Sequence, residues 1–114
     1  LGNDLPQAAA ALGEWAAKEP ELGLADYLVA KNLYNRARWR DAYVRLERAL
    51  RRSLPLESVR REALRTFVFA ACALDERNVA QGALDNYLTD PGLSSARKSG
   101  MQRFAKSCRL SAMP

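Results

Sequence analysis

The fold is decided by the stretch WRDAYVRLERAL, which spans residues 39–50. Its apolar side chains recur at intervals of three and four residues, at Trp39, Ala42, Tyr43, Leu46, Ala49 and Leu50. This spacing places them on one face of a helix with about 3.6 residues per turn. Asp41 lies near the start of the stretch, where its charge suits the helix dipole, and residues 53–55 break it. The stretch therefore predicts an amphipathic helix.

The same periodicity fills the other segments between turn signals. It predicts further helices over about residues 4–18, 24–37, 59–74, 79–88 and 95–108. We expect Asp4 to cap the first helix, Ser58 the fourth, and either Ser94 or Ser95 the sixth. No segment alternates with a period of two, so no strand is predicted. The 114 residues are expected to form a single all-α domain of about six antiparallel helices joined by short turns.

The apolar pattern of residues 39–50 occurs twice more in the chain. The two further copies are Leu5-x-x-Ala8-x-x-x-Leu12-x-x-Trp15 and Arg77-x-x-Ala80-x-x-x-Leu84-x-x-Tyr87. The interval from Ala8 to Ala42 is about 34 residues, which is a period found among helical-repeat proteins. The interval from Ala42 to Ala80 is slightly longer, so a few extra residues are absorbed between the second and third copies, most simply around residues 53–57.

With this period the chain resembles the tetratricopeptide repeat, a unit of two antiparallel helices and about 34 residues. In the best unit, Ala30 fits the small residue at the helix crossing and Trp39 fits the aromatic that opens the second helix. The chain departs from the family at Leu33, where an aromatic is favoured, and at Val68, where a small residue is expected. No Trp or Gly occupies the family's usual places in the first helices.

The resemblance implies a right-handed α-solenoid of stacked helix pairs. Residues 1–20 would be the second half of a repeat, residues 22–55 and 56–91 two repeats, and residues 93–110 a capping helix. We expect further repeats or another domain to precede Leu1 in a longer protein.

Charge is unevenly distributed along the chain, whose formal net charge is +5. Residues 36–65 carry ten Arg and four acidic residues, and residues 97–109 carry five basic residues and no acid. Arg45, Arg48 and Arg52 share one face of their helix. A solvated helix surface is the favoured interpretation, and a nucleic-acid-binding face is the alternative.

The two cysteines, Cys72 and Cys108, lie far apart in the sequence. Cys72 lies in the apolar run 68–73 and is expected to be a small buried residue. A bridge to Cys108 requires the last helix to pack beside it, and the sequence leaves this pairing open. No signal peptide and no apolar run long enough to cross a bilayer is present in these residues, and no compartment is predicted.

Residues that carry catalysis are scarce. The chain has no His, so it lacks the commonest general base and transition-metal ligand. No phosphate-binding glycine loop and no calcium loop is found, and the acidic pairs Glu19/Glu21 and Asp75/Glu76 lie at expected turns. We therefore expect no enzymatic activity, no cofactor and no metal site.

The resemblance implies a scaffold or adaptor domain that binds a protein or peptide. In such arrays the first helix of each unit lines the inner groove, which here means the second, fourth and sixth helices. The groove residues expected on them are Tyr27, Lys31, Tyr34, Asn35, Glu62, Arg65 and Phe69. Besides nucleic-acid binding, the other alternative is a structural or regulatory segment attached to an upstream catalytic domain.

Overall fold

The computed structural model describes residues 23–52, 54 and 56–111, and all regular structure within them is helical. The helices are α2 (Gly23–Asn35), α3 (Trp39–Arg51), α4 (Glu57–Ala73), α5 (Arg77–Leu88) and α6 (Ser95–Ser107). The prediction of an all-α chain is thus confirmed for this part. The helix expected over residues 4–18, with its cap at Asp4, lies outside the described residues.

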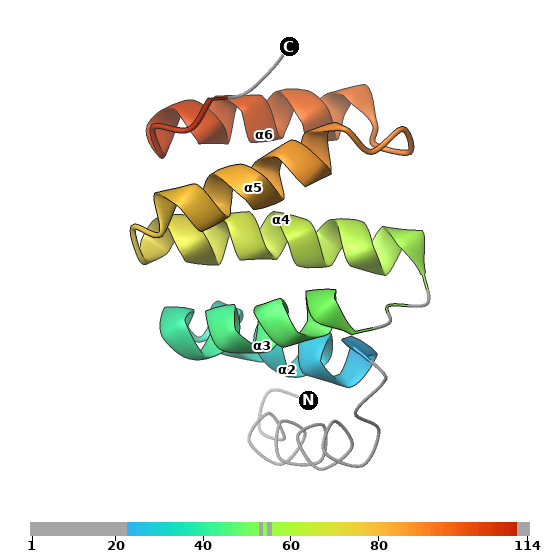
Figure 1. Cartoon of the computed structure of the whole chain (residues 1–114), viewed down its shortest axis with the longest axis vertical. Helices are drawn as coiled ribbons and strands as arrows, with labels where there is room; N and C mark the ends of the chain where they lie inside the picture. The colour runs from blue at the N-terminus through green and yellow to red at the C-terminus, as the bar shows by residue number, and fades with distance from the viewer. Residues whose placement is uncertain (1–22, 53, 55, 112–114) are drawn as a thin grey trace.

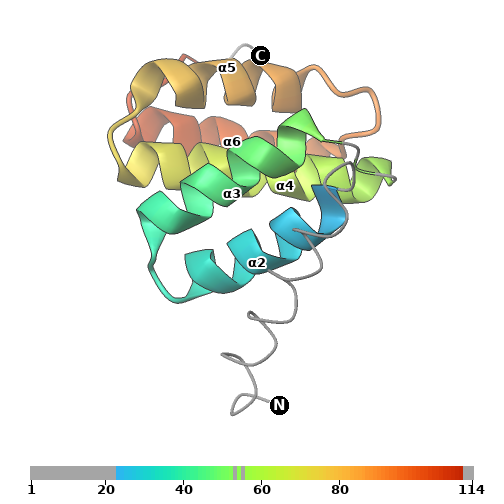
Figure 2. The same cartoon turned by 60° about the horizontal axis from the view of Figure 1, so that its bottom comes forward.

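Consecutive helices run in opposite directions and stack along the long axis of the molecule (Figure 1). Helices α2, α4 and α6 run one way across this axis, and α3 and α5 run back. In Figure 2, α3 lies over α2, and α5 lies over α4 and α6. Helix α4 contacts α2, α3 and α5, and every residue of the apolar stretch 67–74 except Ala73 is buried or half-buried.

The turns after α2, α4 and α6 have the same backbone geometry. In each turn one non-glycine residue adopts the left-handed conformation: Ala37 (φ 58°), Asp75 (φ 58°) and Arg109 (φ 60°). In each, the next amide bonds back to a carbonyl five residues earlier: Arg38 to Leu33 (2.9 Å), Glu76 to Ala71 (2.8 Å) and Leu110 to Ala105 (2.8 Å). This bond satisfies a carbonyl at the helix end, as in a Schellman motif.

The stripe predicted for residues 39–50 faces the core as expected. Ala42, Leu46 and Ala49 are fully buried on α3. On α5, Ala80 and Leu84 are also fully buried, and they are the counterparts of Ala42 and Leu46 in the next copy of the pattern. The second and third copies of the pattern thus bury corresponding positions.

The predicted caps have different outcomes. The prediction for Ser58 is wrong, because α4 begins at Glu57 and its N-cap residue, Leu56, makes no side-chain capping bond. Ser58 already lies inside the first turn, where the acidic Glu57 favours the positive end of the helix dipole. At α6, Ser94 is the N-cap, and its hydroxyl accepts a hydrogen bond of 3.2 Å from the Arg97 amide.

Replacing Ser94 with alanine should therefore lower the free energy of unfolding by about 1 kcal/mol, because one amide at the start of α6 loses its acceptor. Chemical denaturation measures the change. Ser95→Ala is the matched control, since Ser95 is the first residue inside the helix, and it should change stability by less than about half as much. Equal losses for the two variants would contradict the capping role.

Cys72 and Cys108 form a disulfide with their Cα atoms 6.1 Å apart. The bond joins the end of α4 to the residue that follows α6, so the last helix does pack beside Cys72. Cys72 was expected to be buried, but it is only half-buried, because it packs against the edge of the core. In the described part of the chain, no helix has the length and apolar character needed to cross a membrane.

Candidate binding face on helices α2, α4 and α6

Four aromatic rings form a row across the side of the molecule built by α2, α4 and α6. The pairs and their centroid separations are Trp39–Tyr34 (5.1 Å), Tyr34–Phe69 (6.4 Å) and Phe69–Phe104 (4.5 Å). Each ring comes from a different helix, and each is half-buried. Part of the apolar area of these rings is therefore in contact with water. Exposed apolar area of this kind is a candidate contact surface for a partner.

The row lines a hollow of about 460 Å³, called here the aromatic hollow. All four rings and the Cys72–Cys108 disulfide contribute to its wall. Its rim is charged: Arg109 lies there beside an ion pair in which Arg77 Nε is 3.0 Å from Asp75 Oδ1. The hollow therefore combines an apolar floor with hydrogen-bond donors at its edge.

A second hollow, of about 480 Å³, lies between α4 and α6 and is called here the charged hollow. Phe69 lines both hollows, so the two lie next to each other on α4. Arg65 places its guanidinium carbon 4.7 Å from the Phe69 ring centroid, a cation–π arrangement. Glu62 accepts a hydrogen bond from Arg97, and its other oxygen is 3.8 Å from Arg65.

These charges do not cancel within the charged hollow. Two guanidinium groups, those of Arg65 and Arg97, share the single carboxylate of Glu62. The hydrogen bond to Glu62 raises the pKa of Arg97, so this group stays charged. One positive charge therefore remains available to an acidic group on a partner.

The structure brings together four of the seven residues predicted for the groove: Tyr34, Glu62, Arg65 and Phe69. Tyr27 lies in the core with 6% of its surface exposed, and burial, together with nearby Glu62, raises its pKa. Lys31 and Asn35 are exposed on α2 and line neither hollow.

The residues of the face that were not predicted from the sequence include Trp39, Phe104 and Arg97. Trp39 and Phe104 were assigned to apolar stripes, because helical periodicity does not distinguish a ring inside the core from one at its edge.

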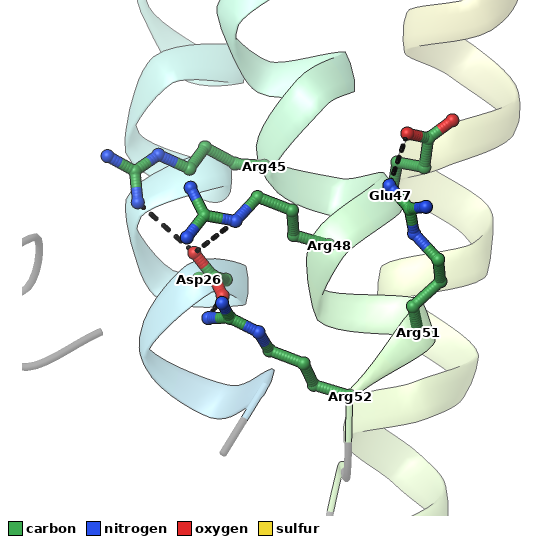
Figure 3. Close-up of polar contacts among 6 residues, drawn as sticks. All are labelled: Asp26, Arg45, Glu47, Arg48, Arg51 and Arg52. Carbon is green, nitrogen blue, oxygen red and sulfur yellow. Dashed lines mark hydrogen bonds and ion pairs between the residues drawn. The ribbon is translucent and has the colours of Figure 1, made fainter. Parts of the chain in front are cut away.

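The arginines in and just after α3 are arranged differently from the prediction. Arg45, Arg48 and Arg52 were expected to form a solvated face. Instead, all three guanidinium groups converge on Asp26 of α2, whose side chain is fully buried (Figure 3). A buried charge is costly unless an opposite charge pairs with it, and Asp26 therefore holds these three arginines in place. The three are called here the arginine face.

The described residues contain no group of three or more Cys, Asp or Glu placed to hold a metal ion. Searches against protein-family models, curated proteins and solved structures found no match to this chain.

Proposed function

We propose that this chain is a tetratricopeptide-like helical-repeat domain that binds a protein or peptide along α2, α4 and α6 and has no catalytic activity of its own. The observation that carries the proposal is the pair of neighbouring hollows that share Phe69 as a lining residue. Together they offer an elongated surface with apolar floor and charged edges, which suits a peptide segment more than a compact small molecule.

The repeat assignment is supported by recurring backbone geometry. The left-handed turn residues Asp75 and Arg109 are separated by about 34 residues, which is the period of the family, and Ala37 precedes Asp75 by a slightly longer interval. The residues that precede α3 and α5 also match, with φ and ψ of −88° and 69° at Arg38 and −87° and 67° at Glu76. In this assignment α2 and α4 are the first helices of their units, and α3 and α5 are the second helices.

The binding role is supported by the kinds of residue on the face. Interfaces obtain most of their binding energy from a few aromatic and arginine side chains near their centre. Phe69 lines both hollows, with Arg65 over its ring and Phe104 in a T-shaped contact with it. These three side chains are the expected anchors.

Nucleic-acid binding through α3 has less support. Such binding needs a continuous row of outward cations to meet successive phosphates. Arg45 and Arg52 instead donate hydrogen bonds to Asp26, and Arg51 pairs with Glu47. The positive charge of Arg45, Arg48 and Arg52 therefore lies around Asp26 and does not form a row along α3.

Selection of short random peptides displayed on phage tests the proposal. Peptides that bind the wild-type chain should bind the Phe69→Ala and Arg65→Ala variants at least about tenfold more weakly, because each variant removes an anchor. Calorimetric titration measures the affinities, and circular dichroism confirms that the variants fold.

Arg51→Ala is the matched control, since Arg51 is an exposed arginine of α3. It should leave peptide affinity unchanged within about twofold. Failure to recover any peptide, or peptides bound equally well by the wild type and by Phe69→Ala and Arg65→Ala, would overturn the assignment of this face.

A further inference from the structure

The arginine face of α3 holds more positive charge than its buried carboxylate neutralises. Arg45 Nη1 donates to Asp26 Oδ1 at 3.1 Å, and Arg52 Nη1 donates to Oδ2 at 2.5 Å. Arg48 Nε is 4.0 Å from Oδ1, beyond hydrogen-bond distance. Three guanidinium groups therefore surround one carboxylate, which leaves two positive charges without a counterion among these four side chains.

Arg48 is the member of the group whose donors remain available. Figure 3 shows its guanidinium between those of Arg45 and Arg52. Within the described part of the chain, no hydrogen bond is found for the Arg48 side chain. An arginine has five N–H donors, and the two neighbours each use one of theirs on Asp26. The three guanidinium groups thus keep most of their donors unused, and they lie close together around Asp26.

This region is accessible but partly desolvated. The side chains of Arg45, Arg48 and Arg52 are 30%, 39% and 22% exposed, whereas Asp26 is fully buried beneath them. Asp26 lies in the first turn of α2, so the positive end of that helix adds to the field. An anion at this position would meet strong, fixed charges at low cost in side-chain ordering, because Asp26 already holds two of the arginines.

We propose that Arg45, Arg48 and Arg52 form a binding site for one phosphate monoester, with Asp26 as the positioning residue. A tetrahedral dianion matches the two excess charges and offers oxygens to several guanidinium groups at once. The phosphate is either free or carried on a serine or threonine side chain, since the same chemistry recognises both. The site lies on the α2–α3 pair, shares no residue with either hollow, and does not depend on the function proposed for the face that contains Phe69.

The test is a calorimetric titration of the full chain with inorganic phosphate and, separately, with a short peptide that contains phosphoserine. Sodium chloride keeps the ionic strength constant, so that general screening does not change between samples. Arg48→Gln should weaken phosphate binding by about tenfold or more, because it removes the donors that face the ligand. This variant should fold, since Arg48 makes no hydrogen bond to Asp26.

Arg51→Gln is the matched control, because Arg51 lies on the same helix and pairs with Glu47 at 2.8 Å, away from Asp26 (Figure 3). It should retain phosphate affinity within about twofold. Binding of the phosphoserine peptide, but not of its serine counterpart, would identify a protein-borne phosphate as the source, and binding of inorganic phosphate alone would identify a free one.

Three results would overturn the proposal. The first is the absence of phosphate binding to the wild type. The second is an equal loss in Arg48→Gln and Arg51→Gln, which would indicate diffuse attraction by net charge. The third is tight binding of a short DNA duplex with a salt dependence that corresponds to many phosphates, which would replace a single phosphate site with a nucleic-acid surface.

Discussion

Replacing Cys72 and Cys108 together with alanine should lower the free energy of unfolding by about 4 kcal/mol. The disulfide closes a loop with a sequence separation of 36 residues, and removing it returns that loop's conformational freedom to the unfolded chain. The loss is a large share of the roughly 5–15 kcal/mol that holds a domain together. Denaturation of the wild type and the double variant by guanidinium chloride measures it.

A reducing agent provides the control for the same prediction. It should destabilise the wild type to the level of the double variant and leave the double variant unchanged. Thiol titration of the unfolded, unreduced wild type should find neither cysteine free. Two free thiols in that sample, or equal stability of the wild type with and without reductant, would contradict the bond.

Asp26→Asn should cost about 2–3 kcal/mol of unfolding free energy, because hydrogen bonds to a buried charged group are lost while the arginines left behind are partly exposed to water. The amide keeps the shape of the carboxylate but removes the charge that holds Arg45 and Arg52 in place. It also introduces N–H donors where guanidinium donors already point, so three cations lose their shared counterion. Thermal and chemical unfolding measure the loss.

Asp41→Asn is the matched control for Asp26→Asn. Asp41 pairs with Arg38 at 2.5 Å, but both side chains are about half exposed, so its replacement should cost about 1 kcal/mol or less. A double-mutant cycle that combines Asp26→Asn with Arg52→Gln should show coupling, because the two groups share a hydrogen bond. A cost for Asp26→Asn no larger than that for Asp41→Asn would contradict the buried network.

The helices could be predicted because each carries a local signal. Ala42, Leu46 and Ala49 recur with the helical period, and their burial follows from that period alone. Ser94 was one of two candidate caps, and the spacing of polar and apolar residues cannot distinguish between neighbours. Ser58 failed as a cap for a related reason, since the chain enters α4 earlier than the pattern indicated.

The contacts between helices could not be predicted, because they depend on how the helices are rotated against one another. Asp26 gave no signal in the sequence, since it stands alone among apolar residues and its three partners lie in and just after the next helix. The disulfide was left open because it requires α6 to pack beside α4. The spacing of Arg45, Arg48 and Arg52 was recognised in the sequence. That their side chains point toward Asp26 and not toward solvent depends on how α2 and α3 pack together.

The candidate site was predictable in its location and only partly in its residues. The resemblance pointed to the faces of the second, fourth and sixth helices, and Tyr34, Arg65 and Phe69 lie on the walls of the hollows found there. Tyr27 was expected beside them but lies in the core, because a one-residue change around a helix turns a side chain by about 100°.

The central proposal is that a partner peptide binds along α2, α4 and α6. Amide NMR spectra of the isotope-labelled chain, recorded while a phage-selected peptide is added, test it most directly. We expect the shifted resonances to cluster around Arg65, Phe69 and Phe104, while those of exposed α3 and α5 residues such as Val44 and Val79 stay in place. Shifts concentrated on α3 and α5, with Phe69 and Phe104 unchanged, would contradict the account.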